Sequence, residues 1–163
     1  MFGYEKILEK LKQEVLLNYP DLVSLILFGS VARNNHRPDS DIDILLISEN
    51  LPNGRGKRID FFSKTIEKNL EEILVQISST PLTIEINPIL KTPNEVLQGG
   101  YIYLDMVEES KLLIDKENFF KDFLCRLKIK MENWGSKKVL FKNSYYWILK
   151  PDLKPGEVLR LDT

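Results

Sequence analysis

The chain has 163 residues, of which 43% are hydrophobic and 29% are charged, so it can form one domain with a substantial core and is neither disordered nor fibrous. Its net charge of −1 gives no general attraction to nucleic acid, and no apolar run approaches the roughly 20 residues of a membrane-spanning helix. Charged residues interrupt the apolar stretches near the N-terminus, so we expect no signal peptide and a cytoplasmic protein. The single cysteine, Cys125, excludes an internal disulfide and a cysteine-based zinc site, and its apolar helical surroundings predict a buried side chain.

Charge is distributed unevenly along the chain. Residues 116–163 contain 11 Lys and Arg against 6 Asp and Glu (+5), whereas residues 1–115 contain 12 against 18 (−6). The C-terminal region is therefore either a basic surface for a partner or an ordinary solvated surface. We expect a domain over residues 1–115, and a C-terminal helix with an aromatic and basic tail over residues 116–163 that packs on it.

The first third of the chain alternates between apolar segments and loops. Apolar residues at helical spacing predict a helix over residues 4–19. Leu22–Phe28 is short and almost continuously apolar, as in a buried strand. Gly29-Ser30 ends this strand and leads, after at most one helical turn, into a polar loop. Ile42–Ile47 predicts a second strand.

The middle of the chain predicts helices and two further strands. Apolar residues three and four apart indicate an amphipathic helix over residues 57–78. The cations around its start, Arg55, Lys57 and Arg58, either steer a triphosphate or begin a solvated helix. A third strand is expected over Leu82–Asn87. The segment Thr92–Glu95 has the N-cap, N1 and N3 residues of a capping box and predicts a helix start. Gly99-Gly100 interrupts that helix, and Lys111–Ile114 predicts an edge strand.

The last third of the chain begins with an apolar stripe from Phe119 to Trp134, which predicts a helix that faces the core or a partner and ends near Gly135. Residues 139–161 contain two prolines and predict a strand followed by an extended tail. The aromatic run Tyr145-Tyr146-Trp147 within them favours a core or interface position over a base-stacking platform.

Together these elements predict an α/β (α+β) layer fold. Strand 22–28 lies beside strand 42–47 in a mixed sheet, and the helices over 4–19 and 57–78 pack on one face. Residues after 115 cover the sheet, bind a partner or extend the fold.

Two carboxylates stand in the second strand at Asp41 and Asp43. Residues two apart in a strand point to the same face, so these carboxylates lie close together and repel each other unless a divalent cation neutralises them. The upstream turn at Gly29-Ser30 offers backbone N–H groups and a hydroxyl to a phosphate. These residues predict a metal–nucleotide site.

The stretch Leu27-Phe-Gly-Ser-Val-Ala-Arg33, followed by Ser40-Asp-Ile-Asp43, resembles the nucleotidyltransferase superfamily with the DNA polymerase β-type fold, and most closely its minimal prokaryotic members. The resemblance implies transfer of a nucleoside monophosphate, with AMP from ATP the first candidate, to a hydroxyl with release of pyrophosphate. Two Mg²⁺ ions would serve as cofactors.

The resemblance also assigns roles to residues. Asp41 and Asp43 would be metal ligands and catalytic groups. Glu85, the acid of the third predicted strand, would be the third carboxylate, ligating metal and accepting the proton; the alternative is a Glu on a solvated strand face. Gly29 and Ser30 would bind the triphosphate, and Arg33 would contact the triphosphate or support the loop. Ser40 would hold the loop in shape before the strand or bind nucleotide. Asn34 departs from the family, where many members have Gly.

Minimal members of this family commonly pair with all-helical HEPN-domain proteins in toxin–antitoxin modules, and small nucleotidyltransferases often self-associate. The resemblance therefore implies an antitoxin that nucleotidylates a HEPN partner. Two alternatives stay open. One is a catalytically inactive module that neutralises its partner by contact, through the Phe119–Trp134 stripe and the C-terminal tail. The other is a small-molecule or RNA nucleotidyltransferase, for which no acceptor-binding domain or strongly basic face is visible.

Overall fold

The computed structural model describes residues 2–35, 37, 40–77, 84–142 and 144–163. In this part of the chain one mixed sheet has the strand order β3-β2-β1-β4. Its strands are β1 (Leu22–Phe28), β2 (Ile42–Ser48), β3 (Ile86–Lys91) and β4 (Lys111–Asp115). β1 is antiparallel to β2 and β4, and β2 is parallel to β3. The predicted mixed sheet, with its first two strands adjacent, is confirmed.

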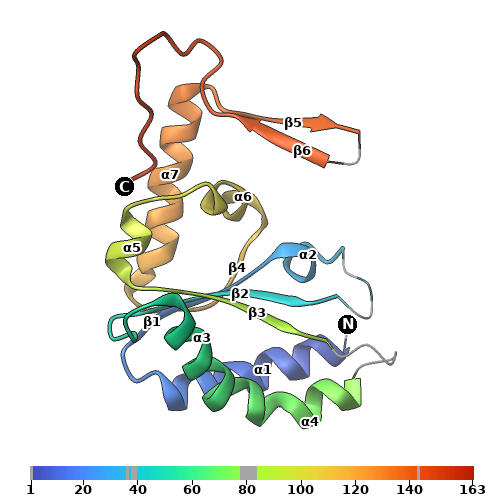
Figure 1. Cartoon of the computed structure of the whole chain (residues 1–163). Helices are drawn as coiled ribbons and strands as arrows, with labels where there is room; N and C mark the ends of the chain where they lie inside the picture. Colours follow the sequence, from blue (N-terminus) through green and yellow to red (C-terminus); the bar gives the residue numbers. More distant parts are fainter. Residues whose placement is uncertain (1, 36, 38–39, 78–83, 143) are drawn as a thin grey trace.

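One face of the sheet is covered by the helices that precede β1 and follow β2 in the sequence (Figure 1). These are α1 (Phe2–Asn18), α3 (Arg55–Phe62), the π-helical turn η1 (Ser63–Glu67) and α4 (Lys68–Ile77). Alternate strand residues such as Leu25, Leu27 and Ile44 enter the core formed with these helices. The two helices expected on this face are confirmed.

The opposite face carries a second core. Ile26 and Leu45 point into it, one residue out of step with the strand residues of the first core. Its cover comes from α5 (Pro93–Leu97), α6 (Ile102–Glu109) and α7 (Phe119–Trp134) (Figure 1). Phe120, Phe123 and Leu127 of α7 are fully buried there. Helices thus pack on both faces of the sheet, and part of the chain after residue 115 covers it.

The third strand differs from its predicted span of Leu82–Asn87. β3 begins only at Ile86, so Ile84 and Glu85 of the predicted strand precede it. The first two predicted residues, Leu82 and Thr83, lie outside the described residues. The strand continues through Pro88, which pairs with Ile44. Proline is tolerated here because β3 is an edge of the sheet.

Local end signals were read correctly at two helices. Thr92 Oγ1 accepts the backbone N–H of Glu95, and the Glu95 carboxylate accepts the backbone N–H of Thr92, which completes the predicted capping box of α5. α7 ends at Gly135, whose φ of +66° suits a glycine.

The C-terminal region departs from the expected single strand. β5 (Lys137–Phe141) and β6 (Ser144–Ile148) form an antiparallel hairpin that projects beyond α6 and α7 (Figure 1). The tail then returns to α5, where the backbone N–H of Thr163 donates to the Leu97 carbonyl. Short connections complete the chain: α2 (Gly29–Ala32) and η2 (Lys116–Asn118).

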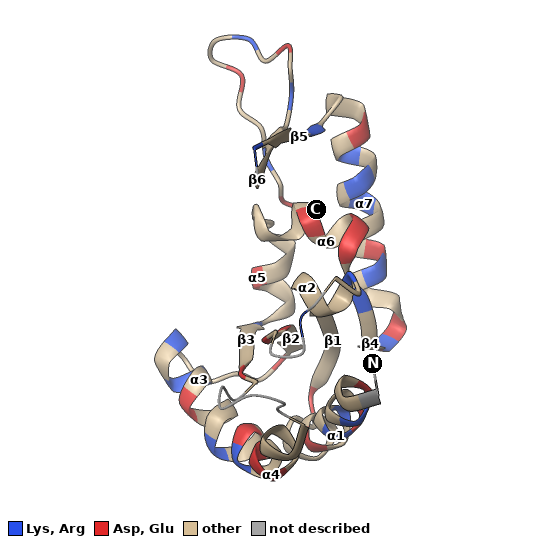
Figure 2. Cartoon of the chain, turned by 90° about the vertical axis from the view of Figure 1, so that its right-hand side faces the viewer, with Lys and Arg blue, Asp and Glu red and all other residues tan. Residues whose placement is uncertain are grey.

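The surface of the C-terminal third has two notable features, an exposed cysteine and the distribution of its charges. Cys125 is exposed on α7 rather than buried, because it lies one position off the helix's apolar face. Along α7 the cations Arg126, Lys128 and Lys130 follow one another with no acid between them, while Asp122 and Glu132 lie nearer the two ends of the helix. Blue and red segments of α7 are both visible in Figure 2. No helix in the described part of the chain has the length and apolar character needed to cross a membrane.

Candidate functional site

The end of β1 and the start of β2 bring the predicted phosphate turn beside the predicted metal ligands. Phe28, the last residue of β1, pairs with Asp43 of β2. The chain then turns at Gly29 directly into α2. Asp41 and Asp43 share the α6-side face of β2 with Leu45, which enters the second core.

Gly29 is required by two separate constraints. Its φ of +72° lies in the left-handed region that favours glycine. A Cβ at this position would stand 2.1 Å from Oδ2 of Asp43, far inside van der Waals contact. Asp43 therefore approaches the backbone of the turn as closely as only glycine permits.

An open pocket of about 440 Å³ lies at this junction. Its lining combines residues from the turn, the following loop and two strands: Ser30, Asn35, Arg37, Ser40, Asp41, Asp43 and Asn87. Four of the seven site residues predicted from the sequence, namely Ser30, Ser40, Asp41 and Asp43, thus meet in one place.

Asp43 carries the clearest electrostatic signature of the site. Its partial burial raises the pKa of its carboxyl, and the nearby Asp41 charge raises that pKa further. Opposing effects come from the Asn87 amide, which donates to Oδ1 at 3.4 Å, and from the charge of Arg33. Two neighbouring carboxylates held in this way are attractive to a divalent cation.

Glu85 is close to Asp41 through its backbone. Its N–H donates to Oδ1 of Asp41 at 3.2 Å, and its carbonyl accepts the N–H of Ile42 at 2.9 Å. Glu85 is exposed, and it also borders a separate hollow beside α4, with Glu67 and Glu71. The structure thus places Glu85 next to the site without bringing its carboxylate into the pocket.

Asn87 was missed as a site residue. It pairs with Asp43 across the parallel β2–β3 ladder and lines the pocket. The alternation of Glu85 and Asn87 was visible in the sequence, and it could have placed Asn87 on the same face as the acids. Among the described residues, no three His, Cys, Asp or Glu side chains cluster closely enough to hold a metal ion together.

The loop between α2 and β2 is held by local hydrogen bonds. Ser40 Oγ accepts the backbone N–H of Arg37 at 2.9 Å, and the Ser40 N–H donates to the Arg37 carbonyl. The Tyr4 hydroxyl donates to the Ser40 carbonyl at 2.6 Å and so connects the loop to α1. Ser40 therefore braces the loop in addition to lining the pocket.

Arg33 follows α2 and extends to α6 rather than into the pocket of the aspartates. Its Nη1 forms an ion pair of 2.9 Å with Oε2 of Glu109. The next residue, Asn34, has a φ of +57°, a conformation that Gly adopts freely and Asn better than most other residues. This explains how Asn34 stands where many members of the resembled family have Gly.

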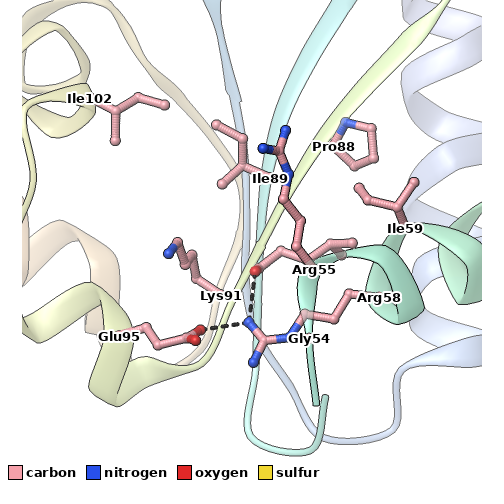
Figure 3. Close-up of a pocket in the computed structure, with 10 residues that line it drawn as sticks. Gly54, Arg55, Arg58, Ile59, Pro88, Ile89, Lys91, Glu95 and Ile102 are labelled. Carbon is pink, nitrogen blue, oxygen red and sulfur yellow. Dashed lines mark hydrogen bonds and ion pairs between the residues drawn. The ribbon is translucent and has the colours of Figure 1, made fainter. Parts of the chain in front are cut away.

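A second pocket, also of about 440 Å³, lies where α3, β3 and α5 meet (Figure 3). Arg58 reaches across it: Nη1 pairs with Oε2 of Glu95 at 2.7 Å and donates to the Leu90 carbonyl, while Nε donates to the Pro52 carbonyl. With these bonds Arg58 joins α3 to the capping box of α5. Arg58 is therefore not part of a solvated helix start, whereas Arg55 and Lys57 are exposed.

The comparisons with known proteins agree with this architecture. Residues 5–113 match the model of the nucleotidyltransferase domain family. A Methanocaldococcus jannaschii protein named a "putative protein adenylyltransferase" is 33% identical over 126 residues, which cover 76% of this chain and 78% of that protein.

Solved structures are more distant. A crystal structure of a toxin–antitoxin with AMP-PNP has a TM-score of 0.49 at 18% identity, covering 77% of this chain and 86% of that one. A structure of a tri-AMPylated Shewanella oneidensis HEPN toxin in complex with an MNT antitoxin has a TM-score of 0.39 at 15% identity, covering 79% and 86%. Neither superposition is close enough to bear on function.

Proposed function

Because the chain belongs to the nucleotidyltransferase domain family, we propose that it transfers AMP from ATP to a hydroxyl group of a partner protein in a Mg²⁺-dependent reaction. The single observation that carries the proposal is the close approach of the Asp43 carboxylate to the Gly29 turn, with Asp41 beside it on the same strand face. The 33% identical relative, named as a protein adenylyltransferase, supports AMP and a protein acceptor.

The reaction requires one bond to form and one to break. The acceptor hydroxyl oxygen bonds to the α-phosphorus of ATP, the bond from that phosphorus to the β-phosphate oxygen breaks, and pyrophosphate leaves. The hydroxyl proton passes to a base. The chain must therefore hold the triphosphate, bring the hydroxyl in line with the leaving group, and accept one proton.

The donor set suits Mg²⁺. Asp41 and Asp43 supply carboxylate oxygens, and the Asn87 side chain adds an amide oxygen after rotation of its amide group. The raised pKa of Asp43 reflects burial and repulsion that a bound cation would relieve. When bound, two Mg²⁺ ions would neutralise the triphosphate and stabilise both ends of the displacement.

The turn is the proposed triphosphate subsite. Gly29 lets phosphate oxygens approach the backbone, and Ser30 lines the pocket that contains Asp41 and Asp43. Arg33, on the other side of the same turn, supplies a positive charge. Ser40 contributes by keeping the loop that precedes Asp41 in shape.

Glu85 is the proposed proton acceptor, since its backbone N–H is hydrogen-bonded to the Asp41 carboxylate and Glu85 itself is exposed. Asn87 has no acid–base capacity in this pH range, so it can position groups but cannot take the proton. Substitutions of Glu85 and Asn87 therefore distinguish proton transfer from positioning.

The first acceptor to test is an all-helical HEPN-domain protein, the partner that the family resemblance implies. The purified chain is incubated with this protein, Mg²⁺ and ATP labelled at either the α- or the γ-phosphate. Transfer of the α-label alone is the predicted result, because AMP retains only that phosphate. Transfer of the γ-label would indicate a phosphotransferase, and transfer of neither label to protein, with AMP appearing on a small molecule or RNA, would overturn the protein acceptor.

A second candidate function is neutralisation of a partner by contact alone. The β5–β6 hairpin favours it, because Leu140, Phe141 and Tyr146 are 82%, 60% and 50% exposed on an element that projects from the body of the domain. An Asp41→Asn/Asp43→Asn variant that still neutralises the partner fully would support this function. Loss of neutralisation with retained complex formation would support catalysis.

A further inference from the structure

Arg33, the cation predicted beside the Gly29-Ser30 turn, is held by an ion pair from another element. Its Nη1 lies 2.9 Å from Oε2 of Glu109, the last residue of α6. The Arg33 side chain is 39% exposed and follows the four-residue helix α2. An arginine in such a position samples many rotamers unless a partner fixes it.

The other oxygen of Glu109 is taken by the hairpin. Nζ of Lys138, on β5, lies 2.7 Å from Oε1 of Glu109 and 3.3 Å from Oδ1 of Asp105. Lys138 and Glu109 are only 20% and 23% exposed, so this part of the network is shielded from water. Two acids on α6 thus face two cations, one from the phosphate turn and one from the hairpin.

Aromatic residues of β6 complete the link. The Tyr145 hydroxyl donates to Oδ2 of Asp105 at 2.9 Å, and Nε1 of Trp147 donates to Oδ1 at 3.0 Å. Nζ of Lys138 stands 4.0 Å from the centre of the Tyr145 ring. Gly29, Arg33, Glu109 and Tyr145 line one hollow of about 200 Å³, so the hairpin and the turn share a boundary.

We propose that Glu109 is a positioning residue, which holds the Arg33 guanidinium beside the Gly29-Ser30 turn for the triphosphate of ATP, and that Lys138 offsets the negative charge this requires. The proposal rests on the proposed function. A guanidinium fixed before ATP arrives loses less rotamer entropy on binding. Without Lys138, the carboxylates of Glu109 and Asp105 would repel the same triphosphate.

The charge states are consistent with this role. The hydrogen bond from Lys138 is the main cause that lowers the pKa of Glu109, with Arg33 adding to it. Glu109 is therefore ionised at neutral pH and pairs with both cations at once. No such link is available to Glu108, its exposed neighbour on α6, in the described part of the chain.

The test is a double-mutant cycle on Mg²⁺-ATP binding by the full chain, measured by calorimetry. Glu109→Ala is expected to raise the Kd about 3- to 10-fold when Arg33 is present and to have no effect in an Arg33→Ala background. Glu109→Gln, which can still accept from Arg33, should restore most of the affinity. Lys138→Met should also raise the Kd. Glu108→Ala and Lys137→Met are the matched controls, and they should leave the Kd unchanged.

Several outcomes would overturn the proposal. Glu109→Ala overturns it if it leaves the Kd unchanged, or if it raises the Kd equally with and without Arg33, since its effect would then not pass through that residue. Thermal unfolding of every variant separates these results from a loss of folding. If the wild-type chain fails to bind Mg²⁺-ATP, the proposed function fails and this proposal with it. If the wild type binds but shows no coupling, only the positioning role fails.

Discussion

Asp43 leaves no room for a side chain at Gly29: its Oδ2 lies 2.1 Å from where a Cβ would stand. The two residues are 14 positions apart in the sequence and are brought together because Phe28 pairs with Asp43 across the β1–β2 ladder. The phosphate turn and the acidic strand are thus one structural unit, and a change in either should be felt by both.

Gly29→Ala is therefore expected to displace Asp43 and to lower the free energy of unfolding by about 1–3 kcal/mol. Both the left-handed φ and the clash contribute. Gly156→Ala is the matched control: Gly156 also has a positive φ, of +85°, but a Cβ there meets open space. Denaturant unfolding and ATP binding check the prediction, which is wrong if the two alanine variants lose equal stability and Gly29→Ala keeps its ATP affinity.

Asp43→Asn is expected to raise Tm in the absence of Mg²⁺, because burial, aided by the Asp41 charge, raises the pKa of Asp43 in the folded state. Because the pKa of Asp43 is raised in the folded state, ionisation of this carboxyl destabilises the fold. The free energy of unfolding is therefore greatest below its usual pKa of 3.8 and falls as pH rises through the raised pKa.

The gain from Asp43→Asn should accordingly be present at pH 7 and vanish below about pH 4. Scanning fluorimetry across pH 3–8 measures it. Mg²⁺ should raise the Tm of the wild type at pH 7 and leave that of the variant unchanged. A variant less stable than wild type at pH 7 would show that the Asp43 charge is already compensated within the protein.

Kinetic and binding measurements distinguish the roles of Glu85 and Asn87. If Glu85 accepts the proton, Glu85→Gln should lower kcat by about 10²- to 10⁴-fold and leave the Kd for Mg²⁺-ATP nearly unchanged. Asn87→Ala should instead weaken Mg²⁺-ATP binding, because Asn87 lines the pocket of the aspartates. The opposite result, a large kcat loss for Asn87→Ala and none for Glu85→Gln, would remove Glu85 from the catalytic set. Glu71→Gln, beside Glu85 in the α4 hollow, is the control.

Glu95→Ala should lower the free energy of unfolding by about 1–3 kcal/mol, because Glu95 both completes the capping box of α5 and pairs with Arg58 at 2.7 Å. The hydrogen bond from Arg58 is the main cause that lowers the pKa of Glu95 below its usual 4.5. Its contribution is therefore complete above that value and is lost as pH falls through the lowered folded pKa.

The exposed Glu72, on α4, provides the control for this prediction. Glu72→Ala should change the stability by less than about 0.5 kcal/mol. If Glu95→Ala costs as little as Glu72→Ala at pH 7, the link between α3 and α5 shown in Figure 3 does not stabilise the fold.

Much of the fold could be predicted because its signals are local. The apolar run Leu22–Phe28, the helical stripe over 57–78 and the capping box at Thr92–Glu95 each need only neighbouring residues to be recognised. The site motif is also local, so the family prediction made from Gly29-Ser30 and Asp41 to Asp43 is confirmed by the match over residues 5–113.

Features that depend on long-range contacts were not predictable. The span of β3 was wrong because Pro88 ends most strands, and only its position at the sheet edge permits it. The network from Arg33 through Glu109 to Lys138 joins residues up to 105 positions apart with no spacing that marks them. Asn87 is an exception to this rule, because its spacing of two from Glu85 was visible in the sequence and could have identified it as a site residue.

The central claim is that Asp41 and Asp43 form, with the Gly29-Ser30 turn, a site for Mg²⁺ and a triphosphate. Calorimetric titration of ATP, with and without Mg²⁺, into the wild type and into Asp41→Asn/Asp43→Asn tests it most directly. We expect ATP binding that requires Mg²⁺ and is lost in the variant. Binding that is independent of Mg²⁺ and equal in the two proteins, or absent from both, would contradict it.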